Sequence, residues 1–310
     1  MLQTLWTRQG EALRDNANEI PWTVYPRPQM KRESYLNLNG YWDFAVSDRE
    51  NLPKEYAKTI RVPFCPESQL SGVGVHFDEG AYLFYKRTVK LPEAFNRGRV
   101  LLHIGAADQI ADVFVNGQPV CHHENGYEAF SCDITEQLVE ENEIVIRCRD
   151  DLKDQSFPYG KQVMKRGGMW YTPVSGIWQS VWLESVPQQH IASLDIRVTT
   201  TDATITVSPA LEGTVRCEGV DYRLHNGHAV IVPNAPHCWT PEDPYLYDFT
   251  VETAEDSVES YFALRTIECR EVNGIPRLLL NGKPYFFHGL LDQGYWPDGL
   301  FTPAKPECYV

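Results

Sequence analysis

The 310-residue sequence lacks the features that mark several common classes of protein. Its first ten residues, MLQTLWTRQG, contain no apolar run of the length that a secretory leader needs, so we expect no such leader. No stretch approaches the roughly 18 apolar residues of a membrane helix. Lys and Arg are scarce, 28 against 42 Asp and Glu, which gives a net charge of −14. Nucleic acids and anionic membranes bind basic faces, so the composition argues against both as partners.

Common metal-binding and nucleotide-binding motifs are also missing. The eight cysteines never form C-x-x-C, and they are too scattered to indicate a zinc site or a tight disulfide framework. We therefore expect reduced, mostly buried thiols in a cytoplasmic protein, and the lack of an N-x-S/T glycosylation signal agrees. The sequence carries no G-x-S-x-G, no H-E-x-x-H and no Walker loop. It predicts no cofactor.

The features that are present indicate antiparallel β structure. Aromatic residues make up 12% of the chain, and large rings pack well on pleated sheets. Asn-Gly, the pair that favours tight hairpin turns, occurs six times and mostly between strand-like runs, as in IADVFVNGQPVCHH and DYRLHNGHAVIVP. Long helical periodicity is nearly absent. We predict two packed-sheet domains, with a boundary near residue 187 and a further change of texture near 269.

Two polar groups invite a chemical role, and the local pattern argues against each. His122, His123 and Glu124 could hold a metal, but adjacent residues of a strand point to opposite faces. Asp292 and Asp298 could form a glycosidase-type carboxylate pair, which must face across the scissile bond at roughly 5 to 9.5 Å. Two aspartates on one loop with Gly and Pro are more typical of turns. We predict neither a metal site nor a catalytic residue here.

Seven blocks of sequence occur in a characteristic order. The most specific is MWYTPVSGIWQSVWLE at 169–184, and LLLNGKPYFFHGLLDQGYWPDG at 278–299 closes the series. The others are RPQ at 27–29 with LNLNGYWDF at 36–44, VPFCPES at 62–68, YKRTV at 85–89, LHIGAADQIADVFVNGQPV at 102–120, and WTPEDPYLYDFTV at 239–251 with YFALRTIE at 261–268. In this order they resemble glycoside hydrolase family 2, the family of β-galactosidases and β-glucuronidases.

The resemblance implies an all-β architecture. A jelly-roll, galactose-binding-like domain would span 1–187, and an immunoglobulin-like sandwich would follow at 188–268. Residues 269–310 would form the first hairpin and strand of a truncated (β/α)₈ barrel. In this family both catalytic glutamates lie later in the barrel, so no catalytic residue is carried over to this sequence. Gly168 stands where β-galactosidases place an acidic sodium ligand, which puts that site in doubt.

The resemblance also implies residues that shape a sugar site. The loop from about Asp150 to Gly176 reaches the barrel mouth in the family, and here it carries Lys161, Lys165 and Arg166. It also carries Trp170 and Tyr171, whose rings suit the apolar face of a sugar, although packing between domains is the alternative role for Trp170.

Three further candidates follow the expected first barrel strand. The end of that strand lies on the catalytic face of any such barrel, which makes His288, Asp292 and Trp296 candidate substrate contacts. For Asp292 the alternative is a turn former. The large apolar side chains between Leu278 and Leu291 should be exposed or poorly packed without barrel neighbours.

The sequence therefore predicts part of a retaining exo-β-glycosidase, with a carbohydrate as substrate of the whole protein and no activity in this chain alone. A homo-oligomer is left open. The rival hypothesis is a free-standing carbohydrate-binding or interaction module.

Overall fold

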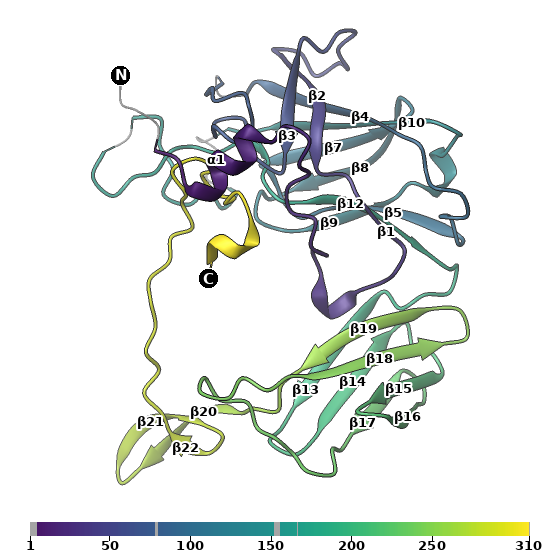
Figure 1. Cartoon of the computed structure of the whole chain (residues 1–310), viewed down its shortest axis with the longest axis vertical. Coiled ribbons are helices and arrows are strands. Elements are labelled where there is room, and N and C mark those ends of the chain that lie inside the picture. Colours follow the sequence, from purple (N-terminus) through teal and green to yellow (C-terminus); the bar gives the residue numbers. More distant parts are fainter. Residues whose placement is uncertain (1–4, 78–79, 152–155, 166, 310) are drawn as a thin grey trace. The chain divides into compact units, whose positions relative to one another are not determined.

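The structure, a computed structural model, describes residues 5–77, 80–151, 156–165 and 167–309. It divides into two compact units (Figure 1). Unit 1 comprises Met1–Pro26, Ser34–Ser185 and Gln293–Val310. Unit 2 comprises Arg27–Glu33 and Val186–Asp292. The predicted boundary at 187 lies beside the break after Ser185, but two segments belong to units other than those expected.

Unit 1 is a sandwich of two antiparallel sheets. The six-stranded sheet has the order β3 (Lys58–Val62), β2 (Gly40–Ser47), β4 (Tyr82–Val89), β10 (Asn142–Arg149), β7 (Ile110–Val115) and β8 (Gln118–Glu124). The four-stranded sheet has the order β1 (Tyr35–Asn37), β12 (Val181–Val186), β5 (Arg99–Ile104) and β9 (Phe130–Asp133). Inward residues alternate along β2 and β7, and the buried residues of both sheets meet in one core that contains Trp42, Phe44 and Tyr85. The predicted jelly-roll sandwich is confirmed.

Short elements complete unit 1. β6 (Ala107–Asp108) pairs with β11 (Gly176–Ile177). Helix α1 (Arg8–Asp15) packs Leu13 into a second small core with Phe64, Leu70 and Ala304. The remaining pieces are the 3-10 helices η2 (Thr135–Gln137) and η3 (Pro306–Tyr309). Among the described residues, no helix combines the length and apolar character that a bilayer crossing requires.

Unit 2 is the predicted immunoglobulin-like sandwich. One sheet has the order β13 (Ser193–Val198), β14 (Ala203–Ser208) and β17 (His228–Ile231). The other has the order β16 (Val220–Leu224), β15 (Gly213–Cys217), β18 (Tyr247–Thr253) and β19 (Ser257–Phe262). A separate small sheet contains β20 (Ile267–Val272), β21 (Ile275–Leu280) and β22 (Lys283–Pro284). The sandwich core includes Tyr247, Phe249 and Phe262.

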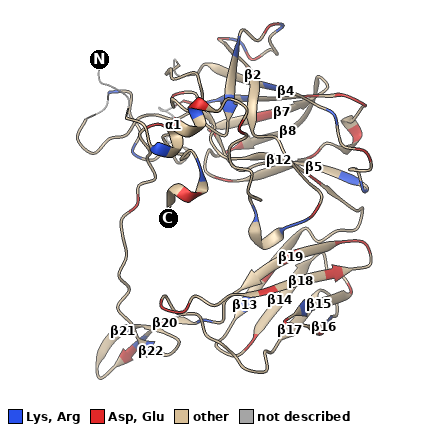
Figure 2. Ribbon diagram, viewed as in Figure 1, with Lys and Arg blue, Asp and Glu red and all other residues tan. Residues whose placement is uncertain are grey.

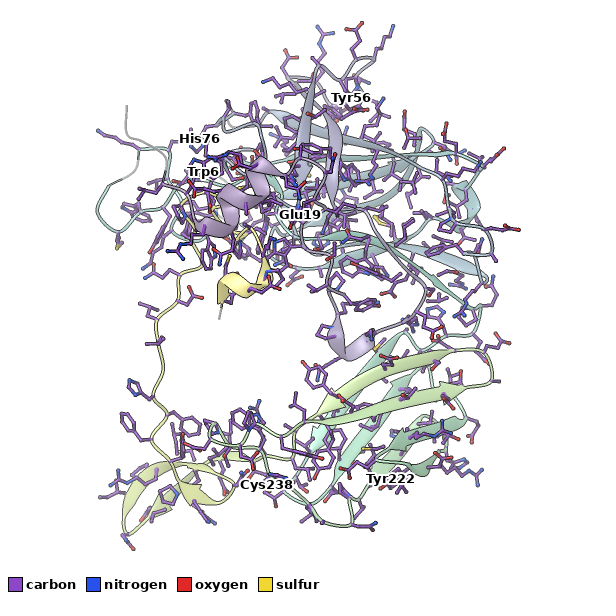
Figure 3. The ribbon with its side chains drawn as sticks, viewed as in Figure 1. Trp6, Glu19, Tyr56, His76, Tyr222 and Cys238 are labelled. Carbon is purple, nitrogen blue, oxygen red and sulfur yellow. A yellow bond between two sulfur atoms is a disulfide. The ribbon has the colours of Figure 1, made fainter. Side chains whose placement is uncertain are left out.

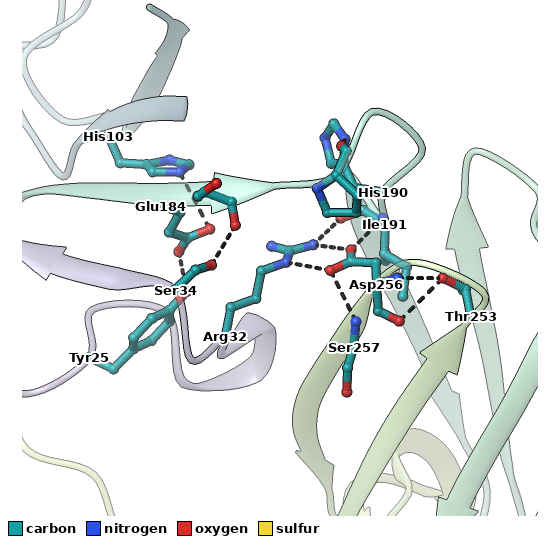
Figure 4. A network of polar contacts seen from close by, with 12 residues as sticks. Tyr25, Arg32, Ser34, His103, Glu184, His190, Ile191, Thr253, Asp256 and Ser257 are labelled. Atoms are coloured by element: carbon teal, nitrogen blue, oxygen red, sulfur yellow. Dashed lines mark hydrogen bonds and ion pairs between the residues drawn. The ribbon is translucent and has the colours of Figure 1, made fainter. Parts of the chain in front are cut away.

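The amino-terminal segment Arg27–Glu33, which contains η1 (Pro28–Met30), belongs to unit 2, where a buried ion pair and backbone hydrogen bonds hold it (Figure 4). Arg32 donates from Nε to Asp256 Oδ1 at 3.1 Å and from Nη2 to Oδ2 at 2.8 Å. Both side chains are only 4% exposed. Lys31 also exchanges backbone hydrogen bonds of 3.0 and 2.9 Å with Glu259, which covers the edge of β19.

A second buried network ties the chain to unit 1 just before it enters unit 2 (Figure 4). The carboxylate of Glu184, fully buried on β12, accepts hydrogen bonds from the Tyr25 hydroxyl and from Trp182 Nε1. His103 Nε2 lies 3.5 Å from the same carboxylate, and the His103 ring stacks on Trp182. Glu184 therefore anchors residues around Tyr25 to the four-stranded sheet.

Five of the six Asn-Gly pairs form turns, as predicted. Five of the six asparagines adopt positive φ, at Asn116, Asn125, Asn226, Asn273 and Asn281. The sixth, Asn39, is buried instead, and its amide donates to Pro21 O and Ser180 Oγ. The strands β1 and β2 on either side of it enter different sheets, so this pair marks a crossing between sheets and not a hairpin.

Two sequence predictions concern the segment after 284 and the cysteines, and the second of them is wrong. Residues 285–295, where the first barrel strand was expected, form neither strand nor helix, and no described strand lies beside them to pair with their backbone; a barrel start cut off from its neighbours is consistent with this. The cysteines are not all reduced, because Cys121 of β8 and Cys132 of β9 form a disulfide. Of the six free cysteines, Cys65, Cys148 and Cys217 are buried. The exposure expected around Leu290 is confirmed at 95%, whereas Leu279 is fully buried in the small sheet.

Candidate functional site

The long loop of unit 1 meets the returning segment 293–309 at a group of aromatic rings. Tyr171 stacks on Tyr295 with ring centroids 4.3 Å apart, and Tyr295 meets Phe301 edge-on at 5.1 Å. Phe301 contacts Trp178 at 5.0 Å and Tyr127 at 6.0 Å. We call these five residues the aromatic rim. They come from three separate stretches of sequence, around residue 127, 171–178 and 295–301, so the rim exists only once unit 1 has folded.

Polar contacts hold the ring pair at the centre of the aromatic rim. The Tyr171 hydroxyl donates to Gln293 Oε1, and the Tyr295 hydroxyl donates to the carbonyl of Thr172 at 3.2 Å. Burial, followed by the neighbouring phenol and thiol groups, raises the pKa of Tyr295, so it stays a neutral donor. Each tyrosine thus binds the segment that carries the other.

Gln162 organises the loop from within. Its side chain is almost fully buried, its Oε1 accepts from the Val174 backbone at 2.5 Å, and its Nε2 donates to Tyr159 O at 2.7 Å and to the Tyr127 hydroxyl at 3.2 Å. Tyr127 is 38% exposed, and partial burial together with the nearby charge of Asp108 raises its pKa to about 12. One amide therefore links residues 159 and 174 of the loop to one ring of the aromatic rim.

Glu67 lies next to the end of the loop. Its carboxylate accepts from Ser175 Oγ at 2.5 Å and from the Ser175 backbone N–H at 3.2 Å. Burial raises the pKa of Glu67 to about 7, the two bonds from Ser175 oppose this rise, and the charge of Asp150 adds to it. The group that anchors β11 therefore titrates near neutral pH.

Asp108 is a second carboxylate in the same region, on β6 opposite Gly176. It is 3% exposed, and burial together with the charges of Asp150 and Glu67 raises its pKa well above the usual range. A Cβ atom added to Gly126 would lie 2.2 Å from Asp108 Oδ1, so glycine is required at the turn over this carboxylate. Paired carboxyls with raised pKa values often mark functional sites, although here they also stabilise the loop.

The predicted substrate contacts fall into two groups. Trp170 is 41% exposed, and Tyr171 forms part of the aromatic rim; both are in unit 1. Trp296 is also in unit 1, half-buried, with its ring edge-on to Tyr309 at 5.4 Å. His288 and Asp292 are exposed and belong to unit 2. The structure therefore brings Tyr171 together with the segment that carries Trp296, and assigns the other pair to a different folding unit.

The charged residues of the loop add no concentrated site. Lys161 and Lys165 are exposed, and Arg166 lies outside the described residues. Lys and Arg are scattered among Asp and Glu in both units (Figure 2). His122 pairs with Asp112 at 2.8 Å and with Glu124 at 3.2 Å, on an exposed strand face. No group of three or more His, Cys, Asp or Glu in the described part of the chain is placed to hold a metal ion.

Sequence reasoning missed the residues that build this region. Glu67 lies in the quoted block VPFCPES and Asp108 in LHIGAADQIADVFVNGQPV, but neither was singled out because a lone acid in a strand block gives no signal of burial. Asp298, considered only as half of a carboxylate pair, is fully buried, and its Oδ2 accepts from the Thr7 backbone and hydroxyl. Only the fold reveals these contacts, since Thr7 is far away in sequence.

Comparison with known proteins agrees with this architecture. Residues 57–167 match the family model described as glycosyl hydrolase 2 galactose-binding domain-like. Residues 181–265 match the model described as glycosyl hydrolases family 2. The β-glucuronidase of Felis catus is 27% identical over an alignment that covers 86% of this chain and 49% of that protein. A β-galactosidase of Thermoanaerobacter pseudethanolicus is 28% identical, covering 82% of this chain and 38% of that protein.

Solved structures share the fold. A β-glucuronidase from an uncultured Clostridium species aligns with a TM-score of 0.71 and 21% identity, over 91% of this chain and 52% of that one. The β-glucuronidase from Ruminococcus gnavus in complex with D-glucuronic acid aligns with a TM-score of 0.69 and 20% identity, over 92% and 54%. This chain spans about half the length of these proteins or less. With both family models matched in order over two β-sandwich units, the chain belongs to glycoside hydrolase family 2.

Proposed function

We propose that this chain is the non-catalytic, amino-terminal part of a retaining exo-β-glycosidase. The observation that carries the proposal is the ordered match to two domains of the family in a chain about half as long as the β-glucuronidases it resembles. The glutamate pair that attacks the anomeric carbon and protonates the leaving oxygen would belong to a barrel encoded beyond residue 310. No residue of this chain is assigned to the chemical step.

The proposed role of unit 1 is to support and shape the sugar site. The exposed ring of Trp170 and the aromatic rim beside it would offer apolar faces to the C–H face of a sugar ring. Gln162 and Glu67 would hold the end of the loop in place through their hydrogen bonds to Val174 and Ser175. Such a loop would contribute binding and orientation while the barrel supplies acid and nucleophile.

The substrate of the whole protein would be a β-linked carbohydrate. Its relatives bear the names β-glucuronidase and β-galactosidase, and both sugars are therefore candidates. No described residue of this chain distinguishes a carboxylate from a hydroxymethyl group at the sugar C6. The cytoplasmic location and a homo-oligomeric state stay predictions from the sequence.

The test compares this chain with a version extended through the downstream reading frame. Purified samples are incubated with aryl β-glucuronide and aryl β-galactoside, and released aryl alcohol is measured. We expect activity only in the extended protein, because a glycosidic bond needs an acid and an anion held on opposite faces of the sugar. Enzyme-like release by the short chain, lost in Asp292→Asn, would contradict the proposal.

The rival hypothesis, a free-standing carbohydrate-binding module, makes a different prediction. Titration calorimetry of this chain with galactose, glucuronate and β-glycans should give dissociation constants in the millimolar range or weaker, about 4 kcal/mol of binding free energy. Micromolar binding that is lost in Trp170→Ala would favour the module.

A further inference from the structure

A buried carboxylate, that of Asp298, links the start of the amino-terminal helix to the segment 293–309 by hydrogen bonds. Asp298 Oδ2 accepts from the Thr7 backbone N–H at 2.9 Å and from the Thr7 hydroxyl at 2.7 Å. The same hydroxyl accepts from the Gly10 backbone N–H at 2.9 Å, so Thr7 caps α1 while it binds Asp298. We call Thr7, Gly10 and Asp298 the clasp. Figure 1 shows α1 and the carboxyl-terminal segment close together, as these bonds require.

Atoms on both sides of Asp298 confine its side chain and its backbone. A Cβ atom added to Gly10 would lie 1.9 Å from Asp298 Oδ2, so a glycine is kept inside a helix, where it is otherwise unfavourable. On its other side, the Asp298 carbonyl accepts from the Leu70 backbone at 3.0 Å, and Leu70 lies in the small core with Phe64. Asp298 is therefore fixed through both its side chain and its backbone.

Further contacts fasten the two segments around the clasp. Trp22 Nε1 donates to Pro303 O at 2.8 Å, and Lys305 pairs with Glu19 at 2.6 Å. Trp6 and Glu19 both lie at the amino-terminal end of unit 1 (Figure 3), where Trp6 packs against the small core. These contacts fasten residues 303–305, whereas the clasp and the Leu70 backbone bond hold Asp298, in the tight loop 296–300.

That loop connects the clasp to the aromatic rim. Trp296 and Leu300 exchange backbone hydrogen bonds of 2.7 and 3.0 Å, which close a tight loop with Asp298 between them. Tyr295 comes immediately before this loop and carries the ring that stacks on Tyr171. Because the loop is short and closed, fixing Asp298 fixes the direction in which the Tyr295 ring leaves it.

We infer that Thr7 and Asp298 are positioning residues for the aromatic rim, acting through Tyr295 on Tyr171 and so on the loop that carries Trp170. The inference that this rim contacts a sugar rests on the proposed function; the positioning itself does not. An element at the start of the chain thereby sets the geometry of a site whose other parts come from the middle and the end of the described sequence.

Hydrogen exchange on this chain tests the positioning. Thr7→Val removes the hydroxyl at nearly constant shape, and Thr7→Ser restores it. In Thr7→Val we expect amides of 293–302 and 171–174 to exchange about 10-fold faster or more, with recovery in Thr7→Ser, because local protection follows local opening. Amides of β7 and β10 should not change.

Thr135→Val is the matched control. Thr135 donates from its backbone and its hydroxyl to Asp133, and its hydroxyl accepts from the Val100 N–H at 2.8 Å, so it repeats the bonding of Thr7 elsewhere in unit 1. Removal of the Thr135 hydroxyl should leave the hydrogen-exchange rates of the backbone amides at the aromatic rim unchanged. Unchanged exchange at the rim in Thr7→Val, or an equal loss there in the control, would overturn the inference. If Thr7→Val also unprotects β7, Asp298→Leu, which keeps side-chain bulk without accepting hydrogen bonds, takes its place with the same expectation.

Kinetics of the extended protein test the link to the sugar. Thr7→Val should raise KM about 5-fold with kcat nearly unchanged, because the rim would contribute binding that is equal in ground and transition states. Altered exchange with an unchanged KM would refute the sugar contact. If the unmutated extended protein hydrolyses neither aryl glycoside, the proposed function fails, while the exchange result still decides whether the clasp positions the rim.

Discussion

Replacing Glu67 by Gln should stabilise unit 1, and should do so more strongly as the pH rises. The carboxyl has an ordinary pKa of 4.5 and, in the folded protein, a pKa of about 7 caused mainly by burial. Below pH 4.5 both states hold the proton, and the group has no effect on stability. Between pH 4.5 and 7 the unfolded chain releases the proton while the folded chain keeps it, so stability falls as the pH rises.

The size of the effect follows from the two pKa values. A rise from 4.5 to about 7 corresponds to a loss of about 3 kcal/mol once the pH exceeds the folded value. The glutamine side chain that replaces Glu67 cannot ionise, and its amide oxygen still accepts one of the two bonds from Ser175. The stability of Glu67→Gln minus that of the unmutated chain should therefore increase by about 2 to 3 kcal/mol between about pH 5 and pH 8.5.

Urea unfolding followed by tryptophan fluorescence is a suitable assay. Seven of the eight tryptophans belong to unit 1, and Trp239 is the one in unit 2, so the signal reports mainly on unit 1. Glu140→Gln, an exposed carboxylate paired with Lys90, controls for the change of net charge. If the stability difference between Glu67→Gln and the unmutated chain is constant with pH, or shrinks as the pH rises, the raised pKa of the partly buried Glu67 is refuted.

Three further predictions follow from unit 2, the disulfide and the segment before Gln293. Arg32→Met should destabilise unit 2 by about 3 to 5 kcal/mol, measured by thermal unfolding, because Asp256 would stay buried without its cation; a loss under about 1 kcal/mol would contradict the buried pair. Alkylation of the denatured, unreduced protein should modify six of eight cysteines, and Cys121→Ser should lower stability by about 3 kcal/mol for a loop of 11 residues; eight modified cysteines would disprove the bond. Limited proteolysis should cut first within 285–292, an exposed stretch without regular structure, and an earlier cut within β7 or β10 would show that this stretch is protected.

The sequence predicted the parts of the fold that depend on local pattern. Alternating runs located the strands of both sandwiches, and five Asn-Gly pairs adopt the backbone that their chemistry favours. The sequence could not predict which sheet each strand joins, since the strands on either side of Asn39, and those on either side of Asn226, belong to different sheets. A turn signal fixes the reversal of the chain, whereas the sheet that each strand joins depends on partners far away in sequence.

The candidate site was predicted in part for the same reason. Tyr171 and Trp296 were found through a resemblance that concerns contiguous blocks, and their loops do come together in unit 1. Glu67, Gln162 and Asp298 were missed because their importance arises from burial and from long-range bonds. The disulfide was missed because its two cysteines show no motif; they come together only because β8 and β9 do.

The exchange of segments between the two units has a consequence for the order in which the protein can fold during synthesis. Unit 2 cannot satisfy Arg32 until Asp256 has been made, and unit 1 cannot bury Leu13 fully until Ala304 has been made. Domains usually complete themselves one after another as the chain emerges from the ribosome. Here neither unit can complete its packing until residues from much later in the sequence have been synthesised, Asp256 for Arg32 and Ala304 for Leu13. Dividing the chain at residue 187 would place Leu13 and Arg32 in one fragment and Ala304 and Asp256 in the other, so neither fragment could form these contacts alone.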